Sequence, residues 1–196
     1  LRACPIVKGS RVQVVYGNRN WVPIYAIGST SGFLAIRNWT ELESGRCFDE
    51  REVRSGAKVC VLGRTVVDQL FRNQEPIGKE VRIANVPFKV IGVLEAKGAN
   101  LLGVDQDDII LAPWTTVKAR VTGEGISTQA TNTTRDSSSR DRVPAASQRI
   151  RSESVHQIMV QAKTTEAVPS AIKEIGIILS ERHRVDPNEP DSSVRD

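Results

Sequence analysis

The chain has 196 residues, of which 39% are hydrophobic and 26% charged, the balance of a globular protein with one domain or two small subdomains. It contains no run of 18 apolar residues, which excludes a transmembrane helix within this sequence. Most of the net charge of +4 lies between Lys118 and Glu153, where no aromatic residue accompanies the arginines, which excludes a stacking surface for nucleic acid.

The beginning of the chain has the pattern of a hairpin followed by short elements. Residues 11–16 predict a strand, residues 17–20 a turn, and residues 21–27 the second strand of the hairpin. Residues 33–39 predict a short helix or a turn, and residues 49–56 predict a polar link. We therefore expect this part of the chain to be rich in strands.

The middle of the chain contains the clearest periodicities. Residues 58–62 predict a strand that leads into a helix, because the apolar side chains that follow fall on one helical face. Val81 and Ile83 then alternate with charged residues, residues 85–87 break the alternation, and residues 88–94 resume it. This pattern predicts a strand, a turn and a second strand with one buried face. The helical face consists of Val66, Val67, Leu70 and Phe71.

A glycine-rich loop at residues 97–103 precedes three crowded carboxylates. Asp105, Asp107 and Asp108 lie directly before an apolar strand that begins at Ile109. The apolar residues that follow offer no further oxygen ligands, so we expect an exposed acidic turn here rather than a calcium site.

The C-terminal part changes in composition and then regains periodicity. Residues 118–154 are polar, with little apolar periodicity, and predict a flexible insert. Residues 155–162 predict a strand, and Thr164 or Thr165 is placed to cap a following helix. Residues 185–195 predict a polar return toward another strand. The apolar stripe of the helix consists of Val168, Ile172, Ile175 and Leu179.

The sequence contains no arrangement of residues that predicts catalysis. Residues 28–32 include serines but lack the Gly-x-Ser-x-Gly order of a nucleophile elbow, and we expect a polar turn there. The Gly-x-x-x-x-Gly-Lys-[Ser/Thr] loop that binds nucleotide phosphates is also absent from the sequence. We therefore expect this chain to be no enzyme and to hold no cofactor.

The three cysteines, Cys4, Cys47 and Cys60, do not have the spacing of a zinc site, and only two histidines accompany them. Cys60 lies within an apolar strand and is interpreted as a small buried hydrophobic residue. A disulfide between Cys47 and Cys60 stays open, because sequence spacing does not define its geometry.

Several segments, taken in order, resemble one known family. They are Val59-Cys60-Val61-Leu62-Gly63, Pro76-Ile77-Gly78-Lys79, Pro87-Phe88-Lys89-Val90-Ile91-Gly92-Val93-Leu94 and Gly103-Val104-Asp105-Gln106-Asp107-Asp108. Their order and spacing are similar to the extracytoplasmic core domain of MacB-type ABC transporter permeases, a group that includes FtsX-like and lipoprotein-releasing permeases. The resemblance covers nearly the whole chain.

The resemblance implies an α+β fold in two parts. A β-rich distal lobe would comprise residues 9–117, and residues 118–154 would be a polar flexible insert. A small α/β lobe of the strand-helix-strand type would comprise residues 1–8 and 155–196 and lie nearer the membrane. The family also implies a longer protein, with transmembrane helices before and after this sequence.

The resemblance further implies a domain on the periplasmic side of the inner membrane. Such a domain couples cytoplasmic ATP hydrolysis to the movement of a substrate, or to the regulation of a partner outside the membrane. The implied partners are the ATP-binding subunit or domain of the same transporter, a second permease copy, and a periplasmic adaptor or other extracytoplasmic protein. The alternative is a soluble extracytoplasmic module that binds a ligand or a protein and has no transport role.

In a transmitting domain, the loop-rich tip of the β-rich lobe is the candidate contact surface. Residues 97–108 combine flexible glycines with apolar side chains and carboxylates. The alternative is an ordinary exposed loop. The predicted partner-binding residues are Leu101, Leu102, Asp105, Asp107 and Asp108.

Overall fold

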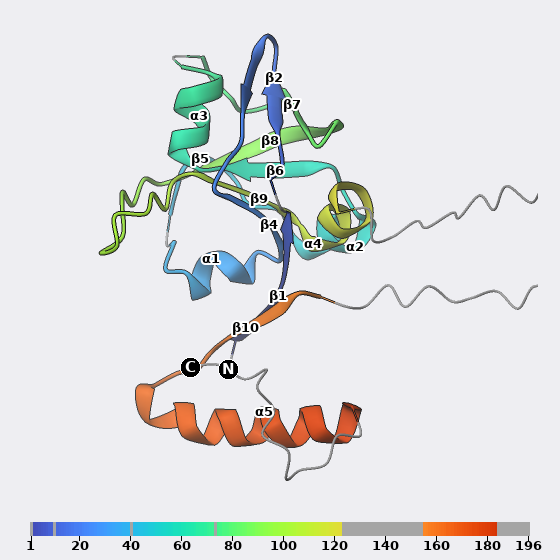
Figure 1. Cartoon of the computed structure of the whole chain (residues 1–196), viewed down its shortest axis with the longest axis vertical. Helices are drawn as coiled ribbons and strands as arrows, with labels where there is room; N and C mark the ends of the chain where they lie inside the picture. The colour runs from blue at the N-terminus through green and yellow to red at the C-terminus, as the bar shows by residue number, and fades with distance from the viewer. Residues whose placement is uncertain (1, 10, 40, 73, 123–154, 184–196) are drawn as a thin grey trace, which may run out of the picture. The chain divides into compact units, whose positions relative to one another are not determined.

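The structure, a computed structural model, describes residues 2–9, 11–39, 41–72, 74–122 and 155–183 (Figure 1). The chain divides into two compact units, Cys4–Met159 on the one hand and Leu1–Ala3 with Val160–Asp196 on the other. The return predicted at residues 185–195 lies outside the described residues. So does the predicted insert, except for its first residues, which continue a helical turn.

The described residues form a mixed sheet of ten strands. Its order is β10-β1-β4-β9-β6-β8-β7-β2-β3, with β5 paired to β8 outside this path. The pairs β4 with β9 and β6 with β8 are parallel, whereas β7 with β8 and β2 with β3 are antiparallel hairpins. The strands are β1 (Arg2–Gly9), β2 (Val14–Tyr16), β3 (Arg19–Trp21), β4 (Tyr25–Ser29), β5 (Leu42–Gly45), β6 (Val59–Leu62), β7 (Glu80–Ile83), β8 (Val86–Leu94), β9 (Ile109–Pro113) and β10 (Gln157–Gln161).

Helices accompany this sheet, and together the two confirm the predicted α+β class. Those of the larger unit are α1 (Gly32–Ile36), α2 (Glu50–Ser55), α3 (Arg64–Leu70), α4 (Trp114–Thr116) and the π-helical turn η1 (Val117–Val121). The smaller unit contains the 3-10 turn η2 (Thr165–Ala167) and the helix α5 (Val168–His183).

The sheet is covered on both faces, because its central strands are apolar on both sides. Along β6, Cys60 and Leu62 pack into one hydrophobic cluster, whereas Val61 packs into the other. The first cluster includes the apolar face of α3, and the second includes residues of α1 and α2, so these helices lie against opposite faces of the sheet (Figure 1). Continuous apolar strands of this kind are typical of sheets buried on both faces. The prediction that Cys60 is a buried hydrophobic residue is confirmed.

The long strand β8 pairs with three neighbours, and glycines allow the closest approach. Its first half pairs with β7 and its second half with β5, while β6 runs parallel to it. A Cβ atom on Gly92 would lie 2.5 Å from the Arg46 carbonyl oxygen, and one on Gly45 would lie 2.2 Å from the Ile91 carbonyl oxygen. Any larger residue at either position would therefore force the two strands apart.

The hairpin predicted between residues 81 and 94 is confirmed, although its turn lies earlier than expected. The turn residues are Ala84 and Asn85, with φ of +48° and +67°, which match the twist of the flanking strands. Val86 and Pro87 already belong to β8. Proline has no N–H to donate to the strand ladder, and Pro87 lies at the beginning of β8, where this loss is tolerated.

The single strand predicted at residues 21–27 is wrong, because the structure divides it into β3 and β4. Pro23 separates the two, since it lacks the N–H that a continuous ladder requires and its φ is fixed. The backbone N–H of Ile24 donates to a carboxylate instead, the side chain of Asp108, at 3.0 Å.

The polar link predicted at residues 49–56 is also wrong, because most of it is the helix α2. Asp49 accepts a hydrogen bond from the Glu52 N–H at 2.8 Å, and the Glu52 side chain accepts one from the Asp49 N–H at 2.9 Å. This capping box starts the helix, and Gly56 ends it in the left-handed conformation. Val53 is the residue of the helix that reaches the core.

The smaller unit confirms the predicted C-terminal helix. Pro169 lies in its first turn, and the predicted apolar stripe is half-buried along its length. Thr164 occupies the N-cap position of η2, but its side chain makes no capping hydrogen bond. Among the described residues, we find no helix that combines the length and the apolar character needed to cross a membrane.

Candidate functional site

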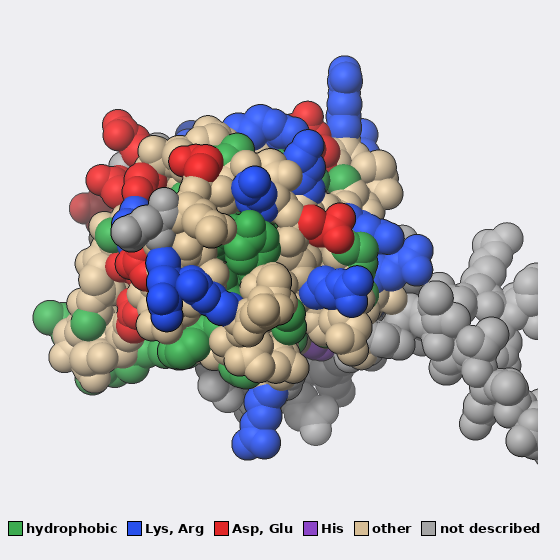
Figure 2. Space-filling model, turned by 90° about the horizontal axis from the view of Figure 1, so that it is seen from above, with side chains coloured by type: hydrophobic (Ala, Val, Ile, Leu, Met, Phe, Trp, Pro, Cys, Tyr) green, Lys and Arg blue, Asp and Glu red, His purple; other side chains and the backbone are tan. Residues whose placement is uncertain are grey.

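The loop between β8 and β9 carries the most exposed apolar side chains of the described residues. Leu101 and Leu102 are 106% and 87% exposed, which confirms that both leucines face solvent. The loop extends away from the sheet, and hydrophobic side chains protrude on the same side of the space-filling view (Figures 1 and 2). A feature of this kind is a candidate contact surface.

The tip of the loop is ordered by its own hydrogen bonds. The Asn100 side-chain oxygen accepts from the N–H groups of Leu102 at 2.9 Å and Val104 at 3.0 Å. The backbone of Asn100 also bonds to Val104 and Gly103 at 2.9 Å each. Gly103 has a φ of +76°, a conformation that glycine adopts without steric cost. The two leucines are therefore displayed on a folded turn.

Asp107 fastens the base of this loop. Its carboxylate accepts hydrogen bonds from the backbone N–H groups of Lys97 and Gly98, both at 2.8 Å. Asp107 is buried, with a residue exposure of 6%. The prediction of an exposed acidic turn is therefore wrong at this position. Burial is tolerated because two backbone donors replace the lost water.

Asp108 binds the segment between β3 and β4 to the base of this loop. The prediction that it is exposed is wrong, because its carboxylate is also buried against N–H donors. Its carboxylate accepts from the Trp21 indole Nε1–H at 2.7 Å and from the Ile24 N–H at 3.0 Å. Its backbone carbonyl accepts from the Tyr25 N–H at 3.1 Å. The residue is only 3% exposed.

Asp105 connects the loop to α3. Its carboxylate accepts from the Thr65 hydroxyl at 2.7 Å and from the Asp107 N–H at 2.8 Å. Asp105 is half-buried, so it is the member of the acidic trio that retains contact with solvent. Each of the three carboxylates thus binds its own set of donors at the base of the loop.

The side chain of Lys97, at the base of the loop, lies over an aromatic ring. Its Nζ lies 4.4 Å from the centre of the Trp39 ring and donates to the Arg37 carbonyl oxygen at 2.6 Å. Desolvation lowers the pKa of Lys97, and the neighbouring Arg37 contributes in the same direction. The Trp39 indole N–H in turn donates to the Glu95 carbonyl oxygen at 3.1 Å.

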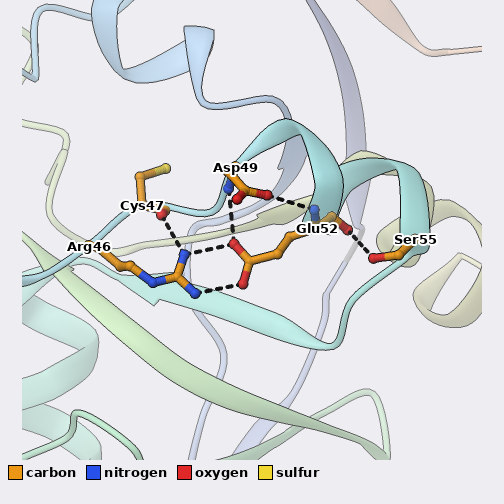
Figure 3. Close-up of polar contacts among 5 residues, drawn as sticks. All are labelled: Arg46, Cys47, Asp49, Glu52 and Ser55. Atoms are coloured by element: carbon orange, nitrogen blue, oxygen red, sulfur yellow. Dashed lines mark hydrogen bonds and ion pairs between the residues drawn. The ribbon is translucent and has the colours of Figure 1, made fainter.

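A separate polar cluster stabilises the start of α2 (Figure 3). The Arg46 guanidinium donates to both Glu52 carboxylate oxygens at 2.7 Å and to the Cys47 carbonyl oxygen at 3.1 Å. The hydrogen bonds from Arg46 hold the pKa of Glu52 below its ordinary value. Because the Asp49 and Glu52 side chains form the capping box and Arg46 holds the Glu52 carboxylate, we interpret this cluster as structural.

The cysteines are free thiols in the structure. Cys60 belongs to the first hydrophobic cluster, whereas Cys47 packs against the second, so the two thiols lie on different faces of the sheet. Burial raises the pKa of the Cys47 thiol to about 11 and raises that of Cys60 as well. Neither thiol is therefore activated as a nucleophile.

The remaining polar groups of the described residues are accounted for as follows. The described residues contain no group of three or more Cys, His, Asp or Glu side chains that could hold a metal ion. Ser29, from the serine-containing segment, is buried at the end of β4 and donates to the Pro5 carbonyl oxygen at 2.7 Å, which corrects the predicted polar turn at this residue. A shallow depression of about 260 Å³ is lined by charged residues of both signs, among them Arg64, Arg72 and Glu75.

Sequence reasoning found the exposed leucines but missed the residues that hold the loop. Trp21 and Thr65 lie far away in the sequence, and nothing in the spacing relates them to the aspartates. Asn100 did carry a local signal, because asparagine before a short turn commonly accepts from backbone N–H groups two residues onward.

Comparison with known proteins places the chain among periplasmic domains. A family model described as the MacB-like periplasmic core domain matches residues 1–177. The macrolide export ATP-binding/permease protein MacB of Syntrophobacter fumaroxidans is 46% identical over 222 residues, covering 100% of this chain and 31% of that protein. The protein of the same name from Rhodopirellula baltica is 43% identical, covering 94% of this chain and 27% of that protein. The chain thus spans less than a third of the length of these curated relatives.

Two solved structures share the fold. The extracellular domain of the noncanonical ABC-type transporter YknZ from Gram-positive bacteria has a TM-score of 0.66 at 19% identity, covering 95% of this chain and 78% of that one. The periplasmic region of MacB from Actinobacillus actinomycetemcomitans has a TM-score of 0.64 at 21% identity, covering 93% of this chain and 67% of that one.

Proposed function

Because this chain belongs to the MacB-like periplasmic core domain family, we propose that it is the extracytoplasmic domain of an ABC export-type permease. In this role it couples cytoplasmic ATP hydrolysis to the movement of a substrate, or to the regulation of a partner, outside the membrane. The family match over residues 1–177 is the observation that carries the proposal. The domain itself performs no catalysis.

The proposed protein is longer than this chain. The relatives are named as ATP-binding/permease proteins, and more than two thirds of their length lies beyond the match. We assign ATP binding and the membrane-spanning helices to that remainder, with this domain on the periplasmic side of the inner membrane. The proposed partners are the ATP-binding domain, a second permease copy and a periplasmic adaptor protein. We also keep the proposed division into a distal lobe of residues 9–117 and a membrane-proximal lobe of residues 1–8 and 155–196.

The geometry supports transmission of movement as the mechanism. Both faces of the sheet are packed, so the larger unit is expected to move as one rigid piece. Buried carboxylates fasten the β8–β9 loop to that unit, so a displacement of the sheet is carried to Leu101 and Leu102. We propose these leucines, with Asp105 at the rim, as the partner contact.

Replacing Leu101 and Leu102 together by serine in the full-length permease tests this role. We expect the melting temperature of the domain to stay nearly unchanged, because surface substitutions seldom change stability by more than about 0.5 kcal/mol. Transport should nevertheless decrease. The control is the exposed Ile178, 55% accessible on α5, replaced by serine. Early melting of the double variant would place the leucines in the core, and normal transport would make the loop a bystander.

Sequencing the flanking reading frame tests the proposed function itself. Hydrophobic helices on either side of this segment and a nucleotide-binding domain in the same operon or chain are expected. A signal peptide followed by this domain and a stop codon would instead identify a soluble binding module and refute the permease.

A further inference from the structure

A second exposed apolar segment lies beside the base of the β8–β9 loop. Residues 21–25, which connect β3 to β4, read Trp-Val-Pro-Ile-Tyr. Val22 and Ile24 are 51% and 54% exposed, and Tyr25 is 39% exposed, whereas Pro23 between them is buried. Pro23 thus anchors the segment while its neighbours face solvent.

Two adjacent aspartates hold this segment and the loop at the same place. Asp107 binds the backbone at Lys97 and Gly98, and Asp108 binds Trp21 and Ile24. The backbone of Tyr25 also donates directly to that of Asp108. Since the two carboxylates are consecutive in the chain, the bases of the two apolar segments are fixed relative to each other.

The exposed apolar side chains are concentrated rather than scattered. Of the nine large hydrophobic residues exposed among the described ones, five lie on these two segments. Single exposed hydrophobic residues are ordinary, but a grouped set indicates an interaction surface. The space-filling view shows hydrophobic side chains along the edge from which the loop protrudes (Figure 2).

The charge around these residues selects the kind of partner. Residues 97–108 contain one lysine and three aspartates, which gives 1 − 3 = −2, although the whole chain carries +4. Asp107 and Asp108 are buried, but the side-chain hydrogen bonds described above pair them with neutral N–H groups, which do not cancel their negative charge. Residues 21–25 carry no charge, and the Lys97 ammonium is directed to Trp39 and the Arg37 carbonyl. An acidic surrounding repels an anionic bilayer and favours a basic protein surface.

We propose that Val22, Ile24, Tyr25, Leu101 and Leu102 form one docking surface for a protein whose facing groove is apolar and bordered by lysine or arginine. The proposal rests on the proposed function, because it names the chemistry of the partner outside the membrane. Hydrogen bonds hold both segments in place before contact, so little conformational entropy is lost on docking.

Photocrosslinking in cells that express the full-length transporter tests whether the two segments meet one partner. Benzoylphenylalanine is placed at position 24 in one variant and at position 102 in another, with Arg54 on α2 as the exposed control position. We expect the same protein to be crosslinked at positions 24 and 102 and not at position 54. The captured peptide should be apolar with neighbouring lysine or arginine. Different proteins at the two positions, or none, overturn the proposal.

A second substitution shows whether the two segments act as a single surface. In the transporter crosslinked at position 102, Ile24→Ser should lower the adduct yield about fivefold, which corresponds to about 1 kcal/mol at a contact residue. The matched control is Ile178→Ser, because Ile178 has nearly the same exposure, 55% against 54%. Equal yields in both variants refute the composite surface.

Vesicles separate the membrane from a protein partner. The purified chain should not sediment with vesicles of phosphatidylglycerol and phosphatidylethanolamine, and sedimentation that Leu102→Ser abolishes would overturn the proposal in favour of a bilayer contact. Failure of the proposed function is distinguishable, because it appears in the flanking sequence, whereas failure of this inference appears only in the adducts.

Discussion

Replacing Asp108 by asparagine tests how firmly the two apolar segments are attached to the sheet. The Asp108 carboxylate is 3% exposed and accepts from Trp21 at 2.7 Å and from Ile24 at 3.0 Å. Asparagine keeps the shape but turns one acceptor oxygen into an NH₂ group, which then faces a donor. One charge-assisted bond is lost and the other weakens. Since such bonds contribute about 1.5–3 kcal/mol each, we expect the free energy of unfolding to decrease by about 3 kcal/mol.

Urea unfolding of the chain, followed by circular dichroism and tryptophan fluorescence, measures this change. The control is Asp68→Asn, because Asp68 is 51% exposed and its ion pair with Arg64 should contribute less than about 1 kcal/mol. A double-mutant cycle with Trp21→Phe isolates the indole bond, since phenylalanine retains an aromatic ring without the N–H. We expect a coupling of about 1–2 kcal/mol. A coupling below about 0.3 kcal/mol would refute the assigned bond.

Three further predictions concern other parts of the fold. Glu52→Ala should destabilise the chain by about 1 kcal/mol at neutral pH, because the capping box of α2 is lost. Since the pKa of Glu52 is lowered in the folded state, the stability it contributes is present above the ordinary carboxyl pKa and is lost as pH falls through the lowered value. Urea titrations of both proteins at pH 7 and pH 3 will show this. Gly63→Ala should lower the free energy of unfolding by about 3 kcal/mol, because its Cβ would lie 2.1 Å from the Asp107 carbonyl oxygen. Gly176→Ala, where nothing lies near the new Cβ on α5, should raise the free energy of unfolding by about 1 kcal/mol. Equal melting temperatures of the two variants would contradict this. Alkylation of Cys47 at pH 8 should be about 100-fold faster in urea than in the native state, because burial raises its pKa from 9.0 to about 11; rapid native labelling would contradict that burial.

Local periodicity in the sequence was sufficient to predict a helix or a strand wherever that element buries one continuous face. The alternation around Val81 and Phe88 predicted the β7–β8 hairpin, and the apolar spacing after Gly63 predicted α3. Both depend on neighbours within a few residues. The helix α2 was missed because it is short and strongly charged, although Asp49 and Glu52 carry the spacing of a capping box.

The candidate site was predictable only at its tip. Leu101 and Leu102 sit in a glycine-rich loop, where apolar residues have no local reason to be buried. The burial of Asp107 and Asp108 was not predictable, because crowded carboxylates are usually solvated. Here their donors come from segments 10 and 87 residues away in the chain, and sequence spacing carries no information about such contacts.

The long strand β8 has a mechanical consequence within the larger unit. It pairs with β5, β6 and β7, and the loop that carries Leu101 and Leu102 follows it directly in the chain. A force applied at the tip of this loop is therefore distributed over three ladders of backbone hydrogen bonds. We expect the strands of this unit to resist such a force together, because no single ladder has to bear it alone.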